Sequence, residues 1–205
     1  ENQHLIYQGP LNDGVRYPGI VGLGLHGNEE GFPPDAFAEV FQSGLAKTGL
    51  LSVPHAGEIA PSPGQGPASV RVAVSQLKAD RVLHGVLAAS DEHLVEELAE
   101  KTVCLDVCPS SNVALSVFDS LGQHPLPALL EAGVRCSLGS DDPLLFGPSV
   151  GEEYERCRVQ MKLADTVLAQ VARCSFEASG APDALKQLGL NGVDQWLSSA
   201  EPGGE

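Results

Sequence analysis

The sequence predicts an α/β fold with a parallel sheet, built as part of a (β/α)8 barrel. Short apolar runs alternate with stretches of helical period, and the connections between runs do not resemble hairpins. The runs end abruptly in polar residues: residues 50–54 lead into His55, and residues 134–138 lead into Ser140 and Asp141. Strand ends of this kind are typical of the C-terminal rim of a barrel, where active sites are assembled. Histidine and carboxylate groups there suit metal-assisted hydrolysis.

Five apolar runs predict five strands, and each run ends in polar or ligand-capable residues. Since the strands alternate with helices, we expect them to lie parallel, with all five ends at one rim. The predicted strands are residues 20–25, 50–54, 81–83, 102–107 and 134–138.

Seven further segments carry a helical period or helix-start signals. One of them opens on Ser90-Asp91-Glu92-His93, which resembles a capping box. Residues 59–67 are rich in proline, glycine and serine, and they predict a loop over the rim that is a candidate mobile lid. The predicted helices are residues 33–49, 68–79, 90–101, 126–132, 152–161, 164–176 and 182–198.

The chain divides into a short leader, one barrel portion and a tail. Turn signals dominate residues 1–19, which predict a loop-rich leader. Residues 20–198 form the predicted barrel portion, and residues 199–205 predict a flexible tail. The 205 residues give room for one ordinary domain, whereas a complete barrel takes about 250 residues. No methionine opens the chain, so we expect it to be part of a longer protein.

Composition and charge argue against several classes of protein. The net charge is −15 and the sequence pI is about 4.6, so the surface repels phosphate backbones and anionic membranes. Because no apolar run of about 20 residues and no signal-peptide pattern occurs, we expect no membrane span. Five scattered cysteines without a CxxC spacing predict reduced, mostly buried thiols and a cytoplasmic protein. We expect Cys104 and Cys108 to serve in packing.

Four short strings lie in order along the chain: His55-Ala56-Gly57-Glu58, His84-Gly85, Cys108-Pro109-Ser110-Ser111-Asn112 and Ser137-Leu138-Gly139-Ser140-Asp141-Asp142-Pro143. At these residues the chain resembles the adenosine deaminase family of zinc-dependent purine deaminases, in which such strings recur in the same order at similar spacing. The resemblance covers about residues 21–196. It implies a TIM-type barrel of the metal-dependent hydrolase kind.

The resemblance implies a zinc ion held by His55 and Asp141. It also implies that Glu58 donates a proton to the purine ring nitrogen next to the attacked carbon, and that His84 orients or deprotonates the attacking water. A partly desolvated carboxyl group can hold a proton at neutral pH, as the role of Glu58 requires. The residues alone also allow a satisfied strand-end histidine at 55, an ordinary loop glutamate at 58 and a rim histidine without chemistry at 84.

Two substrate contacts follow from the resemblance: the backbone N–H of Gly27 meets the purine, and Asp142 holds its imidazole nitrogen. The residues alone equally allow a helix-capping Asp-Asp-Pro turn at 141–143. Two positions depart from the family pattern, namely His26, where a small residue is usual, and Leu83, where glycine is usual. The side chain of His26 either lines the pocket or points away from it.

The family binds zinc with two further histidines, spaced His-x-His on the first barrel strand, and none of the six histidines here has that spacing. With five strands, the chain is expected to cover about strands four to eight of the barrel plus the C-terminal helices. Two protein ligands leave a zinc site half-built, and five parallel strands do not close a barrel. We therefore expect the chain on its own to be inactive and either to associate into homo-oligomers or to adopt a loosened fold.

The resemblance implies zinc-dependent hydrolytic deamination of a 6-aminopurine. The first substrate is adenosine, converted to inosine plus ammonia, because residues 25–29 resemble the adenosine branch of the family. Adenine and an adenine-bearing intermediate of the aminodeoxyfutalosine type stay open as alternatives. A competing hypothesis is a non-catalytic, degenerate barrel protein that binds or scaffolds. The expected partner is a small-molecule purine, with no nucleic acid and no membrane.

Overall fold

A computed structural model describes residues 20–60 and 62–200 of the chain. The predicted leader at 1–19 lies outside the described residues, as do residue 61 of the predicted lid and residues 201–205 of the predicted tail. Residues 199 and 200, also predicted as tail, belong to the last helix. No helix in the described ranges is both long enough and apolar enough to cross a bilayer.

Five parallel strands form one sheet in the order β1-β2-β3-β4-β5, so every strand pairs with the next one along the chain. All five predicted strands are present and parallel, with bounds that differ from the prediction by at most two residues. β1 and β5 are the edge strands, which gives an open barrel segment within the described ranges. The strands are β1 (Gly22–Leu25), β2 (Leu51–Ala56), β3 (Arg81–His84), β4 (Cys104–Val107) and β5 (Arg135–Leu138).

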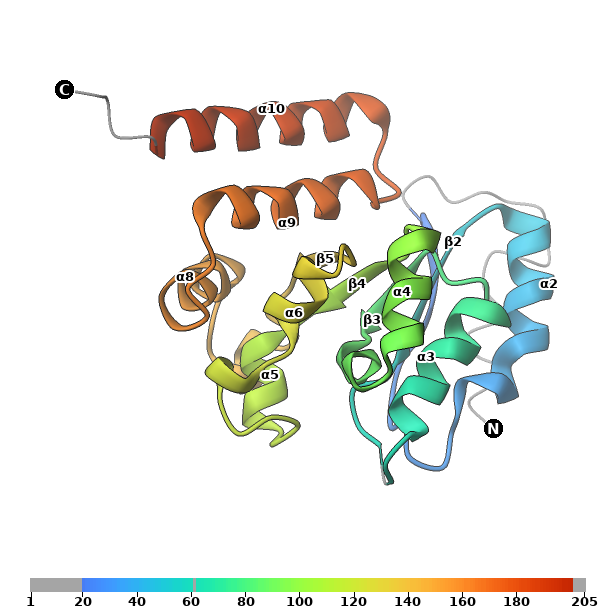
Figure 1. Ribbon diagram of the computed structural model, residues 1–205. Helices are drawn as coiled ribbons and strands as arrows, with labels where there is room; N and C mark the ends of the chain where they lie inside the picture. The colour runs from blue at the N-terminus through green and yellow to red at the C-terminus, as the bar shows by residue number, and fades with distance from the viewer. Residues whose placement is uncertain (1–19, 61, 201–205) are drawn as a thin grey trace.

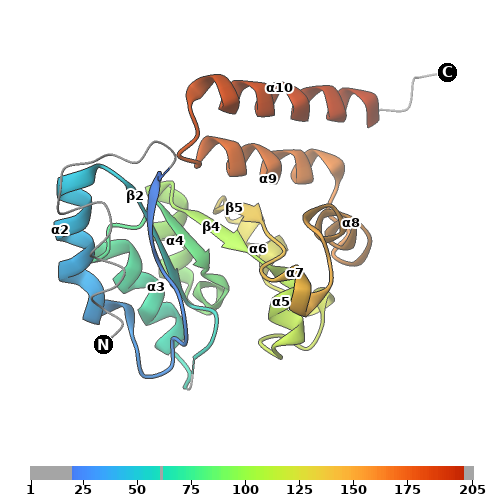
Figure 2. The same ribbon diagram turned by 180° about the vertical axis from the view of Figure 1, so that it is seen from behind.

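Helices and 3-10 turns connect the strands, and three longer helices follow β5. In Figure 1 α2, α3 and α4 lie together on one face of the sheet, and Figure 2 shows the strands from the opposite face. α9 packs on β5, and α10 packs along α9. The elements are η1 (Pro34–Phe37), α2 (Ala38–Thr48), α3 (Gln65–Ser75), η2 (Val86–Ser90), α4 (Glu92–Lys101), α5 (Pro109–Ala114), η3 (Leu121–Gln123), α6 (Leu126–Glu131), α7 (Pro143–Phe146), α8 (Val150–Gln160), α9 (Asp165–Glu177) and α10 (Asp183–Ala200).

Successive side chains along a strand point to opposite faces of the sheet, so one face can be apolar while the other is polar. In β3, Val82 and His84 are buried, whereas Arg81 and Leu83 are half-buried. The helix-covered face builds the core, where each fully buried leucine or valine stabilises the fold by roughly 1.5–3 kcal/mol. This cluster includes Val70, Val82, Leu94, Leu98, Leu105, Val107 and Leu129.

The opposite face carries a polar network across the last three strands. The guanidinium of Arg81 on β3 donates from Nε to Asp106 on β4 at 2.9 Å. The hydroxyl of Ser137 on β5 donates to the same carboxylate at 2.7 Å. Asp106 therefore ties three neighbouring strands together below the rim. All five cysteines are buried and free, which confirms the predicted buried thiols, and burial raises the pKa of Cys104 and Cys108 to about 12.

The starts of α3 and α4 differ from the prediction for identifiable reasons. α3 runs over 65–75 rather than 68–79, because Gly64 in the left-handed region (φ 86°) turns the chain into the helix. Pro67 falls in its first turn, where a missing N–H costs nothing. The predicted capping box at 90–93 is wrong: Ser90 donates to the Leu87 carbonyl within η2, and Asp91 caps α4 instead.

Two short helices, α5 and α7, were not predicted. Neither is long enough to show an apolar period, although each opens on a proline, Pro109 or Pro143, at the first helical position. α8 begins at Val150, two residues earlier than predicted, because Ser149 and Glu152 form a true capping box. α5 and α7 both follow strand ends, so they belong to the rim that carries the site.

Candidate active site

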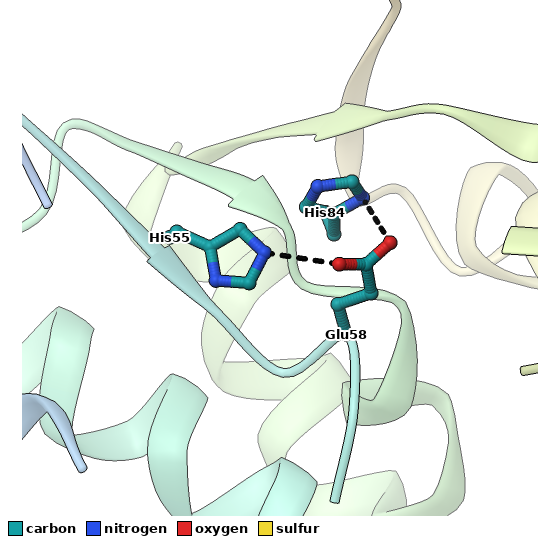
Figure 3. A group of neighbouring side chains, drawn as sticks. All are labelled: His55, Glu58 and His84. Carbon is teal, nitrogen blue, oxygen red and sulfur yellow. Dashed lines mark hydrogen bonds and ion pairs between the residues drawn. The ribbon is translucent and has the colours of Figure 1, made fainter. Parts of the chain in front are cut away.

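Three predicted site residues meet at the rim, where β2 and β3 end (Figure 3). Ala56 pairs with His84 in the sheet, so the two strand ends are neighbours. His55 Nε2 lies 3.1 Å from Glu58 Oε2, and His84 Nδ1 lies 3.2 Å from Glu58 Oε1. The two imidazole rings meet edge to face with centroids 4.7 Å apart. The carboxylate of Glu58 therefore lies between both histidines.

Glu58 is 5% exposed, so its carboxyl group requires polar partners in place of water. Besides the two histidines, the side-chain amide of Asn112 donates to Oε1 at 3.0 Å. The turn that carries Glu58 depends on Gly57, which has φ 71°. A Cβ atom at this position would lie 2.3 Å from Val70 Cγ2, so both the conformation and the space require glycine.

Glu29, in the loop after β1, holds this turn from the neighbouring strand. Its carboxylate accepts hydrogen bonds from the backbone N–H of Gly57 at 2.7 Å and of Glu58 at 3.2 Å. We did not predict a role for Glu29, although an acidic residue just after a strand end was a signal that could have indicated one. The contact fixes where the Glu58 backbone, and with it the side chain, sits on the rim.

His84 ends β3 in the left-handed region, with φ 62°. A non-glycine residue rarely adopts this conformation, and such strain is concentrated at functional sites. Burial lowers the pKa of His84, the carboxylate of Glu58 opposes this shift, and His55 adds to it. Burial of His84 thus favours the neutral form of its ring.

Asp141 follows β5 and also lies in the left-handed region, with φ 56°. Its Oδ2 accepts a hydrogen bond from the Ser111 hydroxyl of α5 at 2.7 Å. Among the residues that the structure describes, the ligand atoms of His55, Glu58 and His84 lie within 4.8 Å of one another, and Asp141 is not one of this group. Asp141 still acts electrostatically on His84, so it lies close to the same rim.

Asp142 caps α7, because its Oδ1 accepts from the backbone N–H of Leu144 at 3.0 Å. The helix-capping alternative is therefore realised, and a substrate role for Asp142 stays a prediction. Gly27 has φ 124°, and a Cβ atom there would meet no atom within 4 Å, which leaves its backbone open to a ligand. His26 Nε2 would lie 2.8 Å from a Cβ on Gly24. The ring of His26 thus folds back over β1.

Burial lowers the pKa of His26, and His55 lowers it further, whereas Asp141 opposes the shift. These interactions place His26 within electrostatic reach of the two predicted zinc ligands. Its ring therefore belongs to the surroundings of the site.

The donor set fits a catalytic metal in kind and in number. Two imidazole nitrogens and a carboxylate oxygen are ligands that zinc takes from proteins, and three protein ligands are usual at catalytic zinc. Every one of the three side chains is less than about one-seventh exposed, with values of 13%, 7% and 6%. A metal ion bound here would have little competition from bulk water.

Several known proteins are similar to this chain. A family model described as Adenosine deaminase matches residues 11–196. A Streptomyces coelicolor protein named as a deaminase of adenosine or adenine is 45% identical over 186 residues, 89% of this chain and 52% of that protein. The solved adenine deaminase of Arthrobacter aurescens has a TM-score of 0.80 at 34% identity, over 87% of this chain and 53% of that one.

An amidohydrolase from Burkholderia ambifaria, solved with bound zinc, has a TM-score of 0.79 at 22% identity. The match covers 90% of this chain and 51% of that chain, and it shows a common fold. This chain spans about half the length of the curated relatives it matches.

Proposed function

The chain belongs to the adenosine deaminase family, and on that premise we propose that it serves the zinc-dependent hydrolytic deamination of a 6-aminopurine. The observation that carries the proposal is the buried carboxyl group of Glu58 between His55 and His84 at the ends of two parallel strands. An acid, a neutral base and metal-ligating nitrogens within one small volume are what hydrolysis of an aromatic amine requires.

Zinc, when bound, supplies a Lewis acid that makes a water molecule nucleophilic near neutral pH. Glu58, in its protonated form, donates to the ring nitrogen beside the amino-bearing carbon, which makes that carbon electrophilic. His84 orients or deprotonates the attacking water. Asp142 holds the imidazole nitrogen of the purine, and the backbone N–H of Gly27 donates to the purine on its other side. The amino group leaves as ammonia, and the ring keeps the oxygen of water.

His55 and Asp141 are the proposed zinc ligands. The group of His55, Glu58 and His84 is the second candidate ligand set, favoured by the short distances among its ligand atoms. The two sets share His55 and differ in whether Asp141 or the acid–base pair contacts the metal.

Adenosine and adenine are both candidate substrates. Residues 25–29 favour adenosine, whereas the name of the Arthrobacter neighbour favours adenine. Ammonia release from each purine by the zinc-loaded, full-length protein tests the proposal, and the ratio of the kcat/KM values assigns the substrate. No release from any 6-aminopurine would instead support a non-catalytic barrel protein. We further propose a cytoplasmic protein, because all five cysteines are free thiols.

A further inference from the structure

A line of hydrogen bonds connects the backbone of α6 with the two proposed acid–base residues. It starts at the backbone N–H of Leu126, which donates to His124 Nδ1 at 3.1 Å. His124 Nε2 lies 3.2 Å from Asn112 Oδ1. Asn112 Nδ2 then lies 3.0 Å from Glu58 Oε1 and 3.3 Å from His84 Nδ1. We name this line the Asn112–His124 relay.

The relay is closed to water, since Asn112 is fully buried and His124 is 4% exposed. The ring of His124 also packs edge to face against Phe118, with centroids 4.9 Å apart. Buried polar groups of this kind must satisfy one another. Every donor in the relay therefore needs an acceptor opposite it, and this requirement decides where each proton lies.

A peptide N–H can only donate, so the Nδ1 atom of His124 must be an acceptor without a proton. His124 is then a neutral imidazole with its proton on Nε2, in agreement with burial, which lowers its pKa to about 4. The Nε2–H group donates to Asn112, which makes the facing amide atom the oxygen. The backbone N–H of Leu126 in α6 thus determines, through His124, which way the amide of Asn112 is oriented.

The amide nitrogen of Asn112 carries two hydrogens, and its two neighbours are Glu58 Oε1 and His84 Nδ1. If His84 carried a proton on Nδ1, this N–H group would face an N–H group of Asn112, and neither of the two could accept a hydrogen bond. We propose that Asn112 and His124 are positioning residues whose relay fixes His84 in the tautomer with its proton on Nε2 and keeps Oε1 of Glu58 as an acceptor. Nδ1 of His84 then accepts from Asn112 and Nε2 carries the proton, so His84 can orient the attacking water as a donor but cannot take its proton.

The competing arrangement places a proton on His84 Nδ1, which lies 3.2 Å from Glu58 Oε1. Long-range 1H–15N NMR of the metal-free protein, labelled with 15N-histidine, distinguishes the two because the protonated ring nitrogen differs. We expect His124 and His84 both to show neutral rings protonated at Nε2. A wild-type His84 ring protonated at Nδ1, or at both nitrogens near neutral pH, would overturn the proposal.

Three variants test whether the relay causes this state. Asn112→Asp keeps the shape but has no donor, so His84 should move its proton to Nδ1 and donate to the new carboxylate. His124→Gln keeps one acceptor and one donor, so His84 should retain the wild-type tautomer. His124→Phe keeps the ring but has no nitrogen, which frees the amide of Asn112, so His84 should become a mixture of tautomers.

An unchanged His84 spectrum in both Asn112→Asp and His124→Phe would show that the relay does not set the tautomer. Circular dichroism identifies any variant that fails to fold, and the wild-type spectrum is decisive without variants. The inference relies on the proposed function only for the roles of Glu58 and His84. Since the readout is a ring proton and not turnover, a full-length protein without deaminase activity would refute the function and leave the relay to be decided separately.

Discussion

One carboxylate oxygen of Glu29 accepts a hydrogen bond from the backbone N–H of Glu58 at 3.2 Å. The other oxygen accepts from the N–H of Gly57 at 2.7 Å. The loop after β1 therefore holds the turn after β2, and the side chain of Glu58 is placed from the neighbouring strand. This arrangement makes Glu29 responsible for the position of the proposed acid.

Substituting Glu29→Gln should lower kcat by about 10- to 100-fold, because an amide has one acceptor oxygen and sets its NH2 group against a backbone N–H. Leaving such a donor unpaired costs about 1–3 kcal/mol, and 1.4 kcal/mol is tenfold in rate. Steady-state ammonia release measures the effect, with Glu30→Gln, at the exposed neighbouring position, as the matched control. Equal kcat values in the two variants would rule out this role of Glu29.

Glu58→Gln should reduce kcat by about 10²- to 10⁴-fold, because the amide cannot give up a proton to the ring nitrogen. The KM should change less, since the shape of the side chain is kept. Glu96→Gln is a suitable control, because Glu96 is a glutamate whose side chain is 75% exposed. If Glu58→Gln keeps kcat within about tenfold of wild type, the acid is another group.

His124 should make the stability of the fold depend on pH. Burial lowers its folded-state pKa to about 4, below the ordinary histidine value of about 6.5, so the unfolded chain binds the extra proton at a higher pH than the folded chain does. The contribution of His124 to the free energy of unfolding is fully present above about pH 6.5. It falls by an amount on the order of 3 kcal/mol as the pH drops toward about 4. Below about pH 4 this contribution stays constant.

Urea unfolding of wild type and His124→Gln across this pH range measures the effect. The free energy of unfolding of wild type minus that of His124→Gln should decrease as the pH falls, because glutamine does not titrate. A difference that stays constant with pH would mean that His124 is not held neutral in the fold.

Gly57→Ala should destabilise the fold more than Gly64→Ala does. Both glycines have positive φ, 71° and 86°, but only at Gly57 would a Cβ atom meet a neighbour, Val70 Cγ2 at 2.3 Å. The left-handed conformation alone costs an alanine roughly 1–2 kcal/mol. Thermal or urea unfolding measures the free energy of unfolding that each variant loses. The additional loss in Gly57→Ala measures the cost of the clash with Val70, whereas equal losses would show that the turn relaxes to avoid it.

Zinc affinity, measured by competition with a chromophoric chelator, should fall most in His55→Ala and Asp141→Asn. Ser111→Ala removes the hydroxyl that donates to Asp141, and loss of such an outer-shell partner typically costs about 10- to 100-fold. His93→Ala, at an exposed histidine, should not change the affinity. If Asp141→Asn binds zinc normally and His84→Gln does not, the ligand set is the group of His55, Glu58 and His84.

Local sequence determined the strands, their parallel order and the identity of several rim residues. Apolar runs that end in His55, in His84 or before Asp141 are readable because strand formation and its termination depend on neighbours a few residues away. His55 and Glu58 are three residues apart, so the sequence also placed them close together. The family resemblance added roles that periodicity alone left open.

Only the tertiary structure decided which side chains hold that rim in place. Glu29 reaches a backbone 29 residues away, and Asn112 reaches Glu58 across 54 residues, whereas His124 lies 12 residues from Asn112. None of these contacts leaves a local pattern, because they arise where parallel strands bring separate loops to one edge of the sheet. A buried hydrogen bond is specified by the geometry at both of its ends, and that geometry exists only once the strands are paired.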